Sequence, residues 1–187
     1  MDNNIVKLIE QRKIAFEEIF INSNVIKFIE DFSIVIANTH QKHSVLICGN
    51  GGSASQASHF AAELVGHYKE KRNLYKPIVL TADSAIMTAL SNDYNFDEVF
   101  SMQIESLGGD KDVLVALSTS GNSNNIIFAL KKARDMGLIT IALLGKGGGM
   151  AKEYADLCYV DKSQDTAIIQ EHHLSILHMV CDILEQQ

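Results

Sequence analysis

The stretch SVLICGNGGSASQASHFAAE, residues 44–63, is the most informative of the chain, because it passes from an apolar run through a glycine loop into a helical pattern. The run VLIC predicts a short strand of a parallel sheet that is buried on both faces. Gly49, Gly51 and Gly52 allow the backbone angles that turn free N–H groups toward an anion. Ser53 opens the helix at its positive end. The stretch therefore predicts a phosphate-binding loop.

The helix after this loop carries two side chains that can bind a metal or transfer a proton. His59 and Glu63 lie four residues apart, so they share one face, roughly a turn and a half beyond the loop. One ligand could therefore touch both the loop and this face.

A dinucleotide-binding loop is the competing interpretation, because Gly49, Gly51 and Ala54 match its permissive fingerprint. That fingerprint also needs an acidic residue about 20 positions further on, at the end of the next strand. Asp83 lies 34 residues past Gly49, so the spacing fits poorly.

Short β-branched runs alternate with helical patterns after residue 43. They predict five strands, at residues 44–48, 77–81, 113–117, 139–144 and 157–160. Strands that alternate with helices form parallel sheets covered on both faces. We expect an α/β, doubly wound fold with a five-stranded parallel sheet.

A chain of 187 residues is expected to form one domain, residues 1–187. We divide it into a helical arm, residues 1–43, and an α/β core, residues 44–187. The arm has two helical segments separated by Asn22-Ser23-Asn24. Its apolar positions either cover the sheet within the chain or pack on the same helix of another subunit.

The third strand is followed by STSGNS, residues 118–123, where hydroxyls replace glycines. Such a loop at a helix N-terminus can surround a phosphate with donors without any lysine. Alternatively, these residues only cap the helix that starts near Asn122. Because ligands bind at the carboxyl ends of parallel strands, two such loops favour a shared anion site.

A long helix is predicted from about Asp165 to the C-terminus. His178 is seven positions after Glu171, so the two side chains project from nearly the same side of the helix. Gln170 and His178 are eight positions apart and differ by roughly 80° about the helix axis. Periodicity does not choose between the two pairs. His172 and His173, each taken singly, are more often satisfied core or surface groups than ligands.

The bulk properties exclude several classes of protein. The net charge of −7 argues against nucleic-acid binding. The N-terminus MDNNIVKLIEQRK is no signal peptide, and no apolar run approaches membrane-spanning length. Cys48, Cys158 and Cys181 are scattered and odd in number, which indicates reduced core thiols. We expect a cytoplasmic protein with neither a nucleic-acid nor a membrane partner.

The chain resembles the bacterial phosphoheptose isomerases of the sugar isomerase (SIS) domain superfamily in four segments. These are CGNGGSASQASHFAAEL at 48–64, SND at 91–93, STSGNS at 118–123 and IIQEHHLSILH at 168–178. The likeness covers nearly the whole chain, including the order and spacing of the segments.

The resemblance implies a role for each matching residue. The sugar phosphate would be bound by Asn50, Gly51, Gly52, Ser53, Glu63, Asn92, Asp93 and Gln170, and its phosphate by Ser118, Thr119, Ser120 and Ser123. One zinc ion per subunit would be bound by His59, Glu63, Gln170 and His178, which selects Gln170 over Glu171. Glu63 and His178 also match the positions assigned to acid–base catalysis. His67 and Ile168 depart from the family pattern, because arginine is common at both positions.

The resemblance also implies an activity. Family members convert sedoheptulose 7-phosphate to D-glycero-D-manno-heptose 7-phosphate through an enediol, for the heptose of lipopolysaccharide and other surface glycans. They form homotetramers with sites near subunit contacts. The alternative is a non-catalytic SIS-domain adaptor similar to the DnaA initiator-associating protein. A sugar-phosphate-sensing transcription regulator would need a basic recognition helix, which the first 43 residues do not contain.

Overall fold

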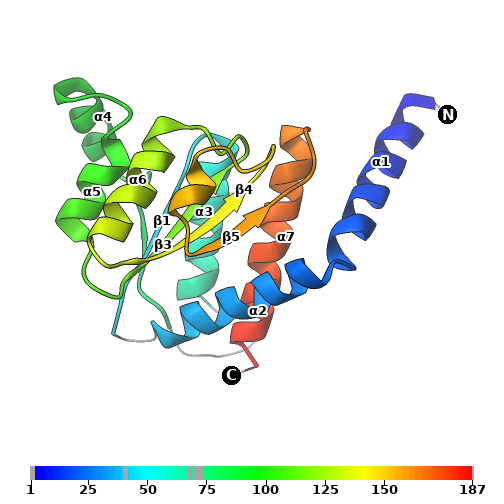
Figure 1. Ribbon diagram of the computed structural model, residues 1–187, viewed down its shortest axis with the longest axis horizontal. Coiled ribbons are helices and arrows are strands. Elements are labelled where there is room, and N and C mark those ends of the chain that lie inside the picture. Colours follow the sequence, from blue (N-terminus) through cyan, green and yellow to red (C-terminus); the bar gives the residue numbers. More distant parts are fainter. Residues whose placement is uncertain (1–2, 40–41, 67–68, 70–73, 187) are drawn as a thin grey trace.

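The molecule has three layers, with a five-stranded parallel sheet between two layers of helices (Figure 1). The computed structural model describes residues 3–39, 42–66, 69 and 74–186, so His67 lies outside the described residues. The strand order is β2-β1-β3-β4-β5, and every neighbouring pair is parallel. The predicted α/β fold with five parallel strands is therefore confirmed.

The strands lie close to their predicted positions: β1 Val45–Gly49, β2 Pro77–Val79, β3 Val113–Ser118, β4 Ile139–Leu144 and β5 Leu157–Val160. Only β2 is clearly shorter than expected. Leu80 still donates its N–H to the carbonyl of Ile47 at 3.0 Å, but the chain then turns toward Asp83. The Asp83 carboxylate accepts the N–H groups of Ala85 and Ile86 and so caps the next helix. This carboxylate therefore serves the helix as its N-cap.

Helices cover both faces of the sheet. One face carries α2 Ser23–Asn38, α3 Gly52–Val65 and α7 Thr166–Leu184; the other carries α4 Ser84–Asp93, α5 Val99–Leu107, α6 Asn124–Asp135 and the 3₁₀ turn η1 Ala151–Tyr154. Side chains alternate between the two cores, as Ile47 and Cys48 do on β1. Across the described ranges, none of the helices combines the length and apolarity needed to span a bilayer.

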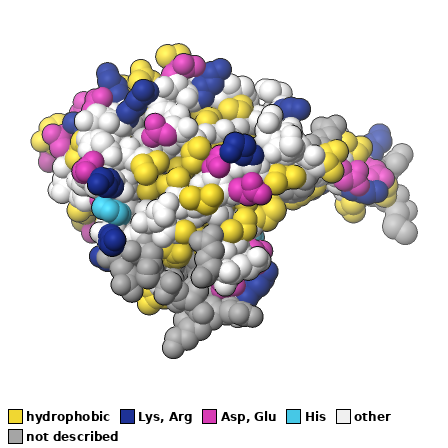
Figure 2. Space-filling view, turned by 60° about the horizontal axis from the view of Figure 1, so that its bottom comes forward, with side chains coloured by type: hydrophobic (Ala, Val, Ile, Leu, Met, Phe, Trp, Pro, Cys, Tyr) yellow, Lys and Arg dark blue, Asp and Glu magenta, His cyan; other side chains and the backbone are white. Residues whose placement is uncertain are grey.

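The arm divides into two parts with different environments. Asn22 caps α2, as the break in the pattern predicted, and α2 packs on α7 and β5 within the chain. In contrast, α1, Asn3–Phe20, projects from the body (Figure 1). Hydrophobic side chains lie along this projection in Figure 2, and five are at least half exposed: Ile5, Val6, Leu8, Ile9 and Ile14. Thus α2 is an intramolecular cover, whereas α1 carries an apolar surface that this chain leaves open.

None of the three cysteines forms a disulfide, as predicted. Burial raises the pKa of the Cys48 thiol to about 12 and that of Cys158 to about 11. Both thiols are therefore protonated at neutral pH and serve as packing groups, not as nucleophiles.

Candidate active site

The two predicted loops leave the sheet at its topological switch point. From β1 the chain moves to β2 on one side, whereas β3, the other neighbour of β1, leads to β4 in the opposite direction. Gly49 at the end of β1 pairs in register with Leu117 near the end of β3. The loops after β1 and β3 are therefore neighbours, and ligands of open α/β sheets bind in the crevice at such a point.

The first loop is a tight backbone turn that only glycine accommodates at two positions. Gly51 has a φ of +54° and occupies the N-cap position of α3. A Cβ at Gly49 would lie 2.7 Å from the carbonyl oxygen of Ser53, which is buried. The side-chain amides of Asn50 and Asn125 donate to each other at 2.9 and 3.0 Å. This pair joins the first loop to α6, the helix that follows the second loop.

The second loop holds its hydroxyls toward the same edge. Ser118 Oγ accepts the N–H of Gly121, and Ser120 Oγ accepts that of Asn122, both at 3.1 Å. Ser123 occupies the N-cap position of α6, yet its side chain makes no capping bond. The Ser123 hydroxyl thus does not cap the helix, and the hydroxyls of Ser118 and Ser120, which accept hydrogen bonds here, can still donate their O–H to a ligand. The half-buried members of the loop are Thr119, Ser120 and Ser123.

Acid–base groups meet between α7 and α3, the helix that begins at the first loop. The Nε2 atoms of His59 and His178 face each other at 2.7 Å, and their rings make an edge contact. Glu63 Oε1 lies 3.6 Å from the Nε2 atom of His59. Burial lowers the pKa of His178, and His59 lowers it further, against the opposing effect of Glu63. A neutral imidazole can both accept and donate a proton, so His178 is suited to proton transfer.

Two successive polar residues of α7 point to different neighbours. Gln170 lies against the first loop, because a Cβ at Gly52 would lie 2.6 Å from its Nε2 atom. Glu171 Oε1 instead accepts a hydrogen bond from Arg12 Nε of α1 at 2.9 Å. Gln170 therefore faces the first loop and Glu171 faces the arm, and the choice of Gln170 as the partner of His178 at a metal stays a prediction.

Two buried histidines of α7 serve the core. His172 Nδ1 lies 2.7 Å from the Asp161 carboxylate, and His173 Nε2 lies 3.2 Å from the carbonyl of Leu144. Burial lowers the pKa of His173 to about 4, so this ring is neutral. These contacts join α7 to the carboxyl ends of β4 and β5 and so position the helix that carries Gln170 and His178.

Comparisons with known proteins agree with this arrangement. Residues 21–145 match the SIS domain family. The chain is 46% identical to the phosphoheptose isomerase of Helicobacter pylori over 153 residues, 82% of this chain and 80% of that one. It is 51% identical to phosphoheptose isomerase 1 of Campylobacter jejuni over 142 residues, 76% of each chain. The chain belongs to the phosphoheptose isomerase family. A solved phosphoheptose isomerase from Francisella tularensis matches with a TM-score of 0.93 at 33% identity, covering 99% of this chain and 98% of that one.

Two residues that the isomerase resemblance places at the substrate lie on the sheet face opposite His59 and His178. Asn92 and Asp93 end α4, are exposed, and hydrogen-bond to each other at 2.9 Å. The helix packs with α5 on the sheet face opposite α7 (Figure 1). The single chain does not bring these residues to His59 and His178, and their contact with substrate stays a prediction.

The donor types of His59, His178 and Glu63 fit a zinc ion. His59 Nε2 lies 2.7 Å from His178 Nε2 and 3.6 Å from Glu63 Oε1, and zinc accepts nitrogen and oxygen ligands of these types. The described part of the chain holds no ready cluster of three His, Cys, Asp or Glu side chains. The fourth ligand implied by the resemblance, Gln170, is an amide that lies against the first loop. Zinc ligation by these residues stays a prediction.

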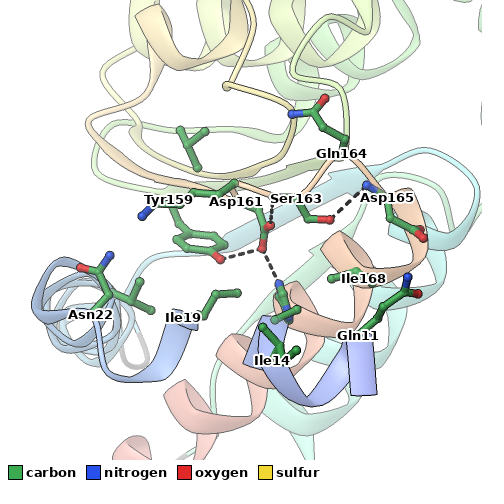
Figure 3. A pocket seen from close by; sticks show the side chains of 15 residues that line it. Gln11, Ile14, Ile19, Asn22, Tyr159, Asp161, Ser163, Gln164, Asp165 and Ile168 are labelled. Carbon is green, nitrogen blue, oxygen red and sulfur yellow. Dashed lines mark hydrogen bonds and ion pairs between the residues drawn. The ribbon is translucent and has the colours of Figure 1, made fainter. Parts of the chain in front are cut away.

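A cavity of about 500 Å³ lies apart from this site, between α1, the end of β5 and the start of α7 (Figure 3). The buried Asp161 carboxylate lies in the wall of this cavity. It accepts hydrogen bonds from the Tyr159 hydroxyl and from the backbone N–H of Ser163, each at 2.7 Å. Ile168, the second departure from the isomerase pattern, also lines this cavity. The cavity contains none of the residues predicted to bind the sugar phosphate.

Sequence analysis missed the residues that support the site. Asn125 pairs with Asn50, the side chain of Gln56 donates to the carbonyl of Gln170, and Asp161 anchors α7. No local pattern distinguishes these residues from ordinary polar positions. The glycine run at 145–149, GKGGG, was a visible signal of a further loop at the same edge.

Proposed function

We propose that this protein is a phosphoheptose isomerase, which converts sedoheptulose 7-phosphate to D-glycero-D-manno-heptose 7-phosphate. The observation that carries the proposal is that Glu63, His59 and His178 meet between α7 and α3, the helix that begins at the glycine loop of the sheet's switch point. An adaptor does not need this set of groups. The identity of 46% to 51% with phosphoheptose isomerases over most of the chain supports the same function.

The phosphate would be bound by hydroxyl and backbone donors. Ser118, Thr119, Ser120 and Ser123 lie at the N-terminal end of α6, where the helix dipole favours an anion. Asn50, Gly51, Gly52 and Ser53 would contact the sugar from the neighbouring loop. Gln170 lies against that loop and would contact the sugar from α7.

Glu63 and His178 would divide the proton transfers. Glu63 would remove the proton from C1 while His178 gives a proton to the oxygen on C2, which forms the neutral enediol. His178 would then take the proton of the C1 hydroxyl, and Glu63 would return its proton to C2. Each group ends in its starting state, so the ketose and the aldose interconvert without a net change in the protein.

We also propose that His59, Glu63, Gln170 and His178 bind one zinc ion. A bound zinc ion would supply Lewis-acid stabilisation of the negative charge that develops on the substrate oxygens. The contact between the His59 and His178 rings and the lowered pKa of His178 support this assignment, because a ligating histidine must be unprotonated.

Metal removal should affect both activity and stability. We expect a chelator to lower turnover on the order of 10²-fold and the melting temperature by roughly 8 °C, and zinc to restore both. Calorimetry and the isomerase assay measure these changes. A His59→Ala variant should lose the chelator-dependent shift in melting temperature. A purified wild-type protein that holds no divalent metal and ignores chelators would refute the zinc assignment.

We propose that the protein assembles as a cytoplasmic homotetramer that serves heptose synthesis for surface glycans. The apolar side chains along α1 support an interface on this helix, because a helix face of this kind needs a partner. The family resemblance supports four subunits.

An acidic residue on this face should disrupt assembly. Ile9 is 62% exposed in the single chain, and Ile9→Asp would place a charge in the proposed interface. Light scattering should give wild-type protein about four times the 20.6 kDa chain mass and the variant a smaller mass. Leu107→Asp, at the exposed end of α5, should keep the wild-type mass. A monomeric wild type, or an unchanged Ile9→Asp variant, would contradict this proposal.

The function is tested directly by incubating purified protein with sedoheptulose 7-phosphate and following the aldose by NMR. Formation of D-glycero-D-manno-heptose 7-phosphate is the expected result. Folded protein that forms no product, with or without added zinc, would refute the isomerase and turn the search toward a protein partner.

A further inference from the structure

The loop after β4, residues 145–149, packs directly on the hydroxyl loop that follows β3. Gly145 donates its N–H to the carbonyl of Ser118 at 3.1 Å, and Ala151 donates to that of Gly121 at 2.9 Å. Met150 donates its N–H to Asn122 Oδ1 at 3.1 Å. The two loops therefore form one unit at the carboxyl edge of the sheet.

This contact depends on glycine on both sides. A Cβ at Gly145 would lie 2.6 Å from the carbonyl oxygen of Thr119, and a Cβ at Gly121 would overlap the carbonyl of Gly148. Such close backbone contact restricts the conformation of Lys146, which follows Gly145 directly. Lys146 is thereby held next to the segment that carries Thr119 and Ser120.

Lys146 is itself in an unusual conformation. Its φ is +48°, and a non-glycine residue in this region is uncommon and often marks a functional position. The side chain is exposed, and no salt bridge to it occurs within the described part of the chain. The loop thus presents an uncompensated cation to solvent.

Charge near the hydroxyl loop is otherwise scarce. Of the segments that leave the carboxyl ends of the five strands, those after β1, β2 and β3 contain no lysine or arginine. Lys146 follows β4, the direct neighbour of β3; Lys152 lies further along the same connection, in η1, and Lys162 follows β5, one strand further away. A phosphate dianion that approaches a chain of net charge −7 is repelled by the overall field. A cation beside the phosphate loop would offset this repulsion.

We propose that Lys146 determines specificity for the phosphate group of the substrate, by electrostatic attraction of the dianion to the hydroxyl loop. The proposal rests on the proposed function, since it assigns the phosphate to the loop at residues 118–123. The hydroxyls would make the hydrogen bonds, and Lys146 would favour the charged substrate over its unphosphorylated form.

The test compares Lys146→Gln and Lys146→Gly with a matched control, Lys111→Gln. Lys111 is also an exposed lysine with a left-handed backbone, at φ +68°, but it precedes β3 at the opposite edge of the sheet. Lys146→Gly removes the charge and relieves the backbone, so its melting temperature should not fall. Steady-state kinetics with sedoheptulose 7-phosphate are measured at low and at high salt.

Both Lys146 variants should raise KM about 5-fold at low salt and leave kcat within about 2-fold. High salt should raise the wild-type KM and remove most of the difference from the variants, because salt screens exposed charges. The control should behave as wild type. An unchanged KM, or an equal increase in Lys111→Gln, would overturn the role of Lys146 and leave the isomerase intact.

The failure of the proposed function has a different signature. Wild-type protein that isomerises no sugar phosphate would overturn the isomerase assignment. Calorimetric titration with inorganic phosphate alone then decides on Lys146: about 5-fold weaker binding in both variants supports its role, and equal binding overturns it.

Discussion

Glu63→Gln should abolish most of the isomerase activity while the protein stays folded. The substitution keeps the size and shape of the side chain but removes the carboxylate that would take the C1 proton. Loss of a general base lowers kcat on the order of 10²-fold or more. The side chain is 22% exposed, so the amide remains solvated and the fold should tolerate it. NMR of the product, with circular dichroism of the variant, measures both effects.

The matched control for this variant is Glu105→Gln. Glu105 is 65% exposed and pairs with Lys132 at 2.9 Å, a surface ion pair that contributes about 1 kcal/mol or less. Its kcat should equal that of the wild type. Turnover of Glu63→Gln within a few-fold of wild type would show that another group takes the proton.

The fold was predictable because its signals are local. Buried parallel strands show as short apolar runs, and helices show a different period, so four strands were placed within one residue at each end. The arm was not predictable in the same way. Periodicity shows that a helix has an apolar face but not what covers that face, so α1 and α2 looked alike in sequence.

The site was predictable in part. The two loops follow strands that pair directly, so a rule about parallel sheets placed them together. The polar run at residues 170–173 could not be resolved by the same means, because its members point around the helix to α1, to β4, to β5 and to the first loop. The assignment of Asn92 and Asp93 rests on resemblance alone, and contacts within one chain do not supply it.

Gly121→Ala should be the most destabilising single substitution in the loops of the site. The added Cβ would overlap the carbonyl of Gly148, and the φ of +64° is unfavourable for alanine. Overpacking should destabilise the folded state by about 1–3 kcal/mol, and the left-handed backbone should destabilise it by about 1–2 kcal/mol more. The melting temperature should fall by roughly 10 °C. KM should rise as well, because the hydroxyl loop must separate from the loop after β4.

Gly147→Ala separates the two causes. Gly147 has a φ of +86°, yet a Cβ there would meet no atom within 4 Å, so alanine adds backbone strain without a clash. Its melting temperature should fall by only about 4 °C, with KM unchanged. If the melting temperatures of both variants fall equally, backbone strain alone explains the loss of stability, and the packing of the two loops contributes nothing. A larger fall in Gly121→Ala, with a raised KM, would show that the loop after β4 holds the hydroxyl loop in its binding conformation.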